Sequence, residues 1–188
     1  TPLYSSAASD VYKRQIWVGP TTDLLSALKP MAFSKRIEAY GKTVMPGLVD
    51  PHTHLVFEGS RENEFAMRIQ GKSCMEIAAA GGGINATVAA TRKAGRQELR
   101  AAARKSLHRM LALGTTAVEA KSGYGLDLTT ELKMLEVIRE LNEEGPMTVV
   151  PTFLGAHGIP PEFRRNPEAY VDLVITRLIP EVAARKLA

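Results

Sequence analysis

The sequence has little of several features that would mark a specialised protein class. One cysteine, Cys74, excludes an internal disulfide framework, and no apolar stretch approaches the roughly 18 residues that a membrane span needs. Lysine and arginine number 24 against 20 acidic residues, without a basic run of five or six, so the charge predicts no nucleic-acid partner. No signal-peptide core is visible. We therefore expect a cytoplasmic protein that binds neither membrane nor nucleic acid.

What is present is typical of a folded domain, since 45% of the residues are hydrophobic and 23% are charged. The two ends differ from the rest. Residues 1–15 have little apolar periodicity and resemble the translation of a sequencing-library adapter, so we expect a non-native segment without a role in fold or function. The last residues, RLIPEVAARKLA, stop within a helix-like pattern, which predicts a chain cut short.

The remaining chain divides into two predicted parts. About residues 16–45, two short β-prone runs are broken by glycine and proline, and they predict part of a small β-rich domain; the runs are IWVGP and RIEAYGKTVMPG. From residue 46 to 188 strands alternate with helices, the pattern of βα units with a parallel sheet. We predict strands at 48–57, 115–121 and 147–157, helices at 97–113, about 129–144 and within 161–187, and an irregular and helical insertion between the first strand and residue 95.

Local signals set the expected bounds of these elements. Apolar residues recur at helical spacing along 97–113, and Gly114 follows as the C-terminal cap. Thr129 or Thr130 is expected to cap the next helix, which Gly145 closes. Cys74 lies in a helix-like stretch, and we expect it to be a small buried apolar residue.

Polar residues stand at the predicted carboxyl ends of the strands. His52 and His54 lie toward the end of the first strand, Tyr124 lies just beyond the second, and His157 lies at the carboxyl end of the third. Three βα units can begin either a (β/α)₈ barrel or a doubly wound sheet. Because barrel enzymes build their sites at this rim, we predict the first strands and helices of a TIM-like (β/α)₈ barrel, preceded by part of the β-rich domain.

The stretch GLVDPHTHLVF places two histidines on one face of a strand, because successive side chains alternate. Two imidazoles that converge in this way can bind a metal at about 2.0 to 2.2 Å, and the metal can activate water and polarise a carbonyl. A His-x-His pattern also fits one histidine in a core and one in solvent. The pattern alone leaves both interpretations open.

Longer motifs resemble a known family. PGLVDPHTHL resembles the first-strand motif of the amidohydrolase superfamily, and EGSRENEF, AGGGINATVAATR, KSGYGLDLTTELKML and TFLGAHGIPPEF together resemble the imidazolonepropionase family, from about Val44 to the C-terminus. The resemblance implies a hydrolase of carbon–nitrogen bonds in cyclic amides. Its reaction would open the imidazolone ring of 4-imidazolone-5-propanoate to give N-formimidoyl-L-glutamate in histidine degradation.

The resemblance also implies roles for particular residues. His52 and His54 match metal ligands, Arg61 matches an arginine that binds the substrate carboxylate, and Tyr124 matches a tyrosine that contacts substrate. His157 matches a catalytic and substrate-binding histidine, suited to donate a hydrogen bond to the carbonyl oxygen as charge develops. The implied cofactor is one divalent or trivalent metal ion, Zn or Fe. The implied partner is a small-molecule substrate, and the resemblance is compatible with a homodimer of the full-length parent.

Only two of the expected ligands lie in the chain. The resemblance places a further histidine, an aspartate and an acid/base group beyond Ala188, so we expect the fragment alone to fold poorly and to be inactive. Two other interpretations stay open. One is a different amidohydrolase, such as a cyclic amidase or a deaminase of a heterocyclic amine, and the other is a non-catalytic α/β module whose histidines are structural.

The sequence holds four weaker signals. GKS at 71–73 lacks the glycine that a phosphate loop needs at position 66, where the chain has Ala66. The glycines of 81–83 fit either an anion cradle at a helix start or a loop. We interpret His108 as structural, and Lys121 as structural or as a residue that supports the metal ligands from behind.

Overall fold

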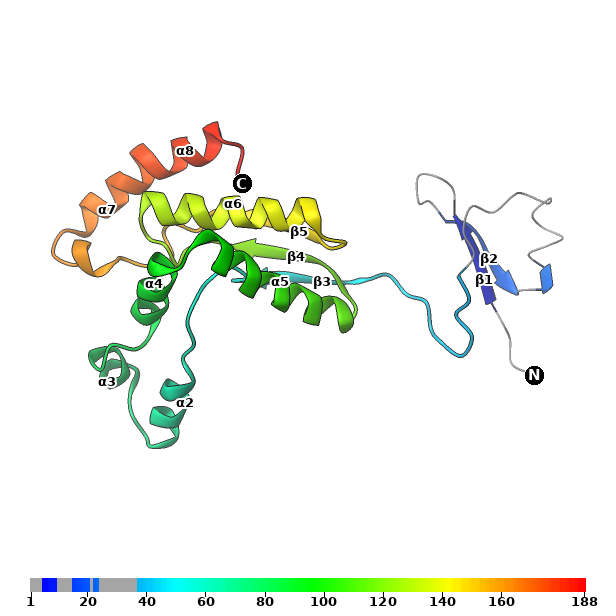
Figure 1. Cartoon of the computed structure of the whole chain (residues 1–188), viewed down its shortest axis with the longest axis horizontal. Coiled ribbons are helices and arrows are strands. Elements are labelled where there is room, and N and C mark those ends of the chain that lie inside the picture. The colour runs from blue at the N-terminus through cyan, green and yellow to red at the C-terminus, as the bar shows by residue number, and fades with distance from the viewer. Residues whose placement is uncertain (1–4, 10–14, 21, 24–36) are drawn as a thin grey trace. The chain divides into compact units, whose positions relative to one another are not determined.

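The computed structural model of the chain describes residues 5–9, 15–20, 22, 23 and 37–188 (Figure 1). The other residues of the predicted segments 1–15 and 16–45 lie outside this part. The chain divides into two compact units, Thr1–Met45 and Pro46–Ala188. Among the described residues, no helix has the length and apolar character needed to cross a membrane.

The first unit contains a β-hairpin. Strand β1 (Ser5–Ser9) pairs antiparallel with β2 (Gln15–Pro20), with an irregularity between Ala8 and Ser9. β2 includes the predicted β-prone run IWVGP, whereas β1 lies within residues 1–15, for which the sequence predicts no strand or helix. The adapter-like origin of residues 1–15 stays a prediction. The second predicted β-prone run is wrong for 37–47, which has only a turn at Tyr40 and Gly41, because Gly41 takes a φ of 70° that breaks an extended strand.

The second unit is built on a parallel three-stranded sheet in the order β3-β4-β5, which confirms the predicted βα organisation. The strands are β3 (Leu48–Thr53), β4 (Thr115–Lys121) and β5 (Thr148–Thr152). The bounds of β4 agree with the prediction, but the first and third strands end earlier than predicted. In β3 the register with β4 shifts between Asp50 and Thr53, around Pro51, which has no N–H to give to a ladder.

Two long helices cover one face of this sheet (Figure 1). They are α5 (Arg96–Ala112) and α6 (Leu128–Glu144), which pack on each other and on β4 and β5. Their apolar stripes join the inward residues of the strands in one core, which includes the fully buried Leu99, Met134, Leu135, Ile138 and Ala120. Burying each large aliphatic side chain contributes about 1.5 to 3 kcal/mol, so this stripe packing is the main source of stability.

The opposite face of the sheet is open among the described residues. Val49 is 65% exposed and Val150 is 51% exposed, whereas Val149, next to Val150, is buried under the helices. Alternation along the strands therefore divides the sheet into one buried and one uncovered face.

The predicted caps of α5 and α6 are confirmed at the C-terminal ends of both helices, whereas the predicted N-cap of α6 is wrong. Gly114 takes a φ of 97° after α5, and Gly145 ends α6, as predicted. The predicted N-cap at Thr129 or Thr130 is wrong, since the cap is Asp127, whose carboxylate accepts from the Thr130 N–H at 2.7 Å. An aspartate at the last extended residue reaches this N–H, which places both threonines inside the first turn.

The insertion between β3 and α5 holds three short helices, α2 (Glu62–Ile69), α3 (Cys74–Ala79) and α4 (Ile84–Lys93). Cys74 is exposed, so its predicted burial is wrong. It starts α3 directly after the Ser73 cap, and Ile77 takes the inward position instead. The glycine run before α4 does bind an anion, but of the chain itself, because the Gly83 N–H donates to Glu64 Oε1 at 2.6 Å.

The predicted helical stretch after Pro161 is broken into four parts. These are η1 (Pro161–Phe163), α7 (Pro167–Leu173), the π-helical η2 (Val174–Leu178) and α8 (Ile179–Ala184). Asn166 caps α7, and Pro180, which lacks an N–H, follows the π-turn. Buried Tyr170 holds this segment to the loop after β5 by donating from its hydroxyl to the Gly155 carbonyl at 2.6 Å.

Candidate functional site

The two histidines of β3 lie where this strand ends. His52 is exposed within the strand, and His54 is half-buried just after it, with ring centroids 6.4 Å apart and the rings nearly perpendicular. Thr53, between them, donates from Oγ1 to the Glu119 carbonyl of β4 at 2.6 Å. This bond holds the strand end against β4, so the backbone that carries both imidazoles is firmly placed.

Tyr124 and His157 meet His54 at this edge of the sheet. The ring of His54 stacks on that of His157, with centroids 4.5 Å apart and 17° between planes, and lies 4.7 Å from the ring of Tyr124. Tyr124 and His157 are themselves 5.2 Å apart. Tyr124 follows β4 and His157 follows β5, so the parallel strands bring together residues that are distant in sequence, as predicted.

Arg61 reaches the same region through a cavity. This cavity, of about 270 Å³, is lined by Phe57, Gly59, Ser60, Arg61, Thr87 and Tyr124. Its size is close to the lower end of small-molecule sites. Arg61 therefore faces the same space as Tyr124, whose ring is also 5.8 Å from that of Phe57.

The environment of His54 keeps its imidazole neutral. Burial lowers its pKa from 6.5 to about 4, with further lowering by the nearby His157, His52 and Lys121, against a hydrogen bond with the Ser122 backbone that raises it. Its Nδ1 atom is buried and has no hydrogen-bond partner among the described residues. A neutral imidazole with an unsatisfied ring nitrogen is the form that binds a metal ion.

His157 has a defined tautomer. Its Nδ1 atom lies 3.0 Å from the carbonyl oxygen of Gly123. A carbonyl oxygen only accepts, so Nδ1 carries the proton and donates it. In the neutral ring, Nε2 is then left with its lone pair, and it donates a hydrogen bond only when the ring is protonated.

A charged pair on β4 lies beside the histidines. The Lys121 ammonium contacts Glu119 Oε1 at 2.6 Å, and the Thr152 hydroxyl donates to the same oxygen at 2.7 Å. The hydrogen bond from Lys121, followed by that from Thr152, lowers the pKa of Glu119. No motif in the sequence pointed to Glu119, although its i, i+2 spacing from Lys121 places both side chains on one face of β4.

The two histidines fit part of a metal site. Among the residues that the structure describes, no group of three or more His, Cys, Asp or Glu side chains gathers as a metal centre. A tetrahedral ion about 2.1 Å from two ring nitrogens would hold the ring centroids roughly 5 Å apart, a little closer than they lie. His52 is exposed, so the packing of the described residues does not fix its side chain in this position. The donor atoms therefore suit two ligands of a larger set.

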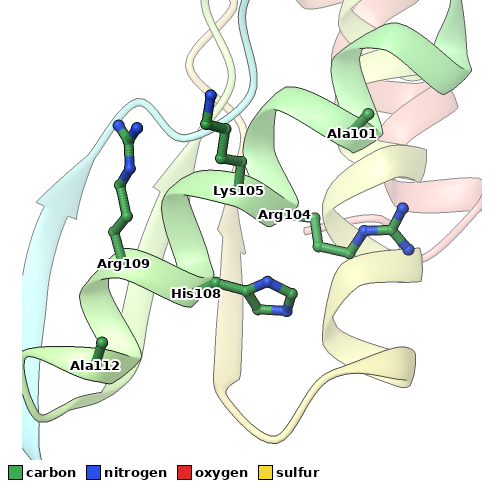
Figure 2. Close-up of a pocket in the computed structure, with 6 residues that line it drawn as sticks. All are labelled: Ala101, Arg104, Lys105, His108, Arg109 and Ala112. Carbon is green, nitrogen blue, oxygen red and sulfur yellow. The ribbon is translucent and has the colours of Figure 1, made fainter.

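A larger hollow, of about 410 Å³, lies elsewhere, on the outer face of α5 (Figure 2). Its lining residues are Ala101, Arg104, Lys105, His108, Arg109 and Ala112. All six belong to one helix, so the hollow is a groove along a helix surface. It is not built by converging elements, and His108 has no part in the site described above.

Known proteins are similar to this chain over most of its length. An imidazolonepropionase of Brevibacillus brevis is 58% identical over 152 residues, which are 81% of this chain and 36% of that protein. The imidazolonepropionase of Geobacillus kaustophilus is 51% identical over 172 residues, 91% of this chain and 41% of that protein. That of Herpetosiphon aurantiacus is 57% identical over 148 residues, 79% and 35% of the two chains.

No protein-family model matches the chain. It spans only between about a third and two fifths of the length of these curated relatives. The identity is nevertheless high over about four fifths of the chain or more. By its sequence, the chain belongs to the imidazolonepropionase family.

Proposed function

We propose that the protein containing this chain hydrolyses the imidazolone ring of 4-imidazolone-5-propanoate to N-formimidoyl-L-glutamate, a step of histidine degradation. The observation that carries the proposal is the meeting of His54, Tyr124 and His157 at the carboxyl ends of β3, β4 and β5. The curated relatives are named imidazolonepropionase, and the resemblance of the motifs to that family implies the reaction.

The chain's own side chains have distinct tasks in this proposal. Arg61 binds the propanoate of the substrate, because a guanidinium fork matches a carboxylate in shape and charge. The rings of Tyr124 and Phe57 form an apolar wall of the cavity that Arg61 shares. The imidazolone ring then lies between Arg61 and the stacked histidines.

The tautomer of His157 decides which hydrogen bonds its ring can make to the substrate. With Nδ1–H held by the Gly123 carbonyl, neutral His157 accepts at Nε2 from a ring N–H of the imidazolone. It donates to the ring carbonyl oxygen, the role expected from the resemblance, only as an imidazolium. The Gly123 carbonyl accepts from Nδ1 in both forms, so the ring keeps the same orientation in either role.

His52 and His54 are the residues that would hold the metal. When bound, a zinc or iron ion supplies Lewis-acid polarisation of the carbonyl and activation of water. The neutral state of His54 and its unsatisfied Nδ1 support this assignment. The remaining ligands are assigned to the part of the relatives' length that this chain does not span.

We further propose that β3, β4 and β5 are the first strands of a TIM-like barrel. Their parallel order, the cluster of functional residues at one rim and the uncovered second sheet face with Val49 and Val150 support this. A cytoplasmic location also belongs to the proposal. The exposed free thiol of Cys74 suits a reducing compartment.

The test uses the intact gene product that contains this chain. Metal content is measured by mass spectrometry, and turnover by the appearance of N-formimidoyl-L-glutamate. We expect one metal per chain and hydrolysis for the wild type and for the control His108→Ala, since His108 is an exposed residue of α5. His54→Ala should lose both.

Two outcomes would contradict the proposal. Bound metal with turnover of another cyclic amide or a heterocyclic amine, but not of the imidazolone, would identify a different amidohydrolase. Protein without metal or hydrolysis would instead support a non-catalytic module.

A further inference from the structure

The loop between β4 and α6, residues Ser122 to Leu126, is organised around a buried carboxylate. Glu131, in the first turns of α6, is 0% exposed. Its Oε1 atom accepts from the N–H groups of Gly125 at 2.8 Å, Leu126 at 2.9 Å and Gly123 at 3.1 Å. Its Oε2 atom lies 3.0 Å from the same Gly123 N–H. Three backbone donors therefore surround one side chain.

These bonds hold a backbone shape that the loop would not adopt by itself. Gly123 has a φ of 107°, and Leu126, which is not a glycine, has a φ of 53°. A left-handed conformation is uncommon for a leucine and persists only where surrounding contacts determine it. Without the carboxylate, the three N–H groups would be buried without partners, which is costly.

Arg92 of α4 fastens the same loop through its carbonyl groups. Its Nε donates to the Gly125 carbonyl at 2.7 Å and one terminal nitrogen donates to that of Leu126 at 3.1 Å. The loop is thus held by an anion on its N–H groups and by a cation on its carbonyls. Of the two, only Glu131 binds Gly123, the residue directly before Tyr124.

The clamped loop carries two features of the proposed site. Tyr124 lies between Gly123 and Gly125, whose N–H groups both donate to Glu131. The Gly123 carbonyl accepts from His157 Nδ1. The packing leaves no spare room, since a Cβ atom added at Gly123 would lie 2.7 Å from the Leu154 carbonyl oxygen and 2.8 Å from His157 Cβ.

We propose that Glu131 is a positioning residue of this site: its carboxylate shapes the loop so that Tyr124 faces the cavity of Arg61 and the Gly123 carbonyl holds the His157 ring. The catalytic consequence rests on the proposed function, whereas the anchoring of the loop does not. Loss of the carboxylate should displace Tyr124 and break the hydrogen bond from His157 Nδ1 to the Gly123 carbonyl, so that the ring no longer keeps one tautomer.

The experiment compares Glu131→Gln with Glu136→Gln in the intact, zinc-loaded gene product. Both residues are glutamates of α6, but Glu136 is partly exposed and pairs with Arg96 and Arg185 on the helix surface. Hydrogen exchange of peptides covering 122–126 reports on the anchor without any turnover. Steady-state kinetics with 4-imidazolone-5-propanoate then reports on positioning.

In the wild type, the amides of 123, 125 and 126 should exchange slowly. Glu131→Gln should speed their exchange about tenfold, the effect of replacing charge-assisted hydrogen bonds by weaker ones, and raise KM at least about tenfold. Glu136→Gln should leave the exchange and KM within about twofold of the wild type. A purely structural role would change the amount of folded enzyme and leave KM unaltered.

Each contrary result overturns a defined part. Fast exchange at 123, 125 and 126 in the wild type refutes the anchor even if Glu131→Gln does not fold. A folded Glu131→Gln enzyme with faster exchange but an unchanged KM refutes the positioning role. Slow wild-type exchange without imidazolone hydrolysis refutes the proposed function and leaves the anchor standing.

Discussion

Replacement of Arg92 by methionine should destabilise the second unit far more than the same change at Arg96. Arg92 joins three segments, because besides the carbonyls of Gly125 and Leu126 it contacts Asp127 at 2.9 Å and Glu162 at 2.8 Å. Its side chain is 28% exposed. Methionine keeps the length and the apolar contacts of the stem but removes every polar contact.

The magnitude follows from these contacts. Two charge-assisted hydrogen bonds to carbonyls are worth about 1.5 kcal/mol each at the lower end of their range, which suits a partly exposed donor. The two ion pairs, whose carboxylates are 34% and 45% exposed, add at most about 0.5 kcal/mol each. We therefore expect Arg92→Met to lower the free energy of unfolding by about 3 kcal/mol.

Arg96→Met is the matched control. Arg96, the first residue of α5, also pairs with acidic residues of another helix, namely Glu136 and Glu140 of α6. These pairs lie on the helix surface, so the loss of Arg96 should lower the free energy of unfolding by under about 1 kcal/mol. Urea unfolding followed by circular dichroism measures both. With a slope of about 2 kcal/mol per molar urea, the midpoint should fall by roughly 1.5 M for Arg92→Met. Equal midpoints for the two variants would refute the reasoning.

Three further predictions concern single residues. Arg61→Ala in the intact enzyme should raise KM about tenfold with little change in kcat. Arg68, which pairs with Glu64, is the control, and Arg68→Ala should leave KM unchanged. Equal KM values for the two variants would refute the binding of the substrate carboxylate by Arg61. The pKa of His54 is about 4 in the folded protein, against 6.5 in the unfolded chain. Between these values the imidazole is protonated in the unfolded chain but not in the folded protein. Metal-free protein should therefore lose stability as pH falls from 6.5 toward 4. His54→Gln should abolish this part of the loss in urea titrations at pH 7 and 5, and an identical pH dependence in both proteins would contradict it. Asp127→Ala should lower the stability of the unit by about 1 kcal/mol and Thr129→Ala by less, and the reverse order in thermal unfolding would reject Asp127 as the cap.

Much of the fold could be predicted because its signals are local. Strand β4, helix α5 and the glycines that end α5 and α6 follow from alternation, helical spacing and backbone freedom over a few residues. Predictions failed where a longer-range contact decided. β3 ends at Thr53 because its pairing with β4 ends there, although Leu55 and Val56 continue the apolar run and are buried.

The candidate site divides in the same way. Motifs located His52, His54, Arg61, Tyr124 and His157, and parallel strands explain why three of them meet. No motif indicated that Glu131 would be buried under the loop. A glutamate in the first turns of a helix is ordinarily a solvated residue that favours the helix dipole.

By itself, the sequence determined the alternation of strands and helices, the rim at which the polar residues stand and the family to which the chain belongs. Only the tertiary structure decided the neutral state of His54, the tautomer of His157 and the clamp of Glu131 and Arg92 on the loop. The physical reason is distance along the chain. Periodicity acts between residues two to four apart, whereas burial and hydrogen bonding depend on partners that only the packed chain brings together.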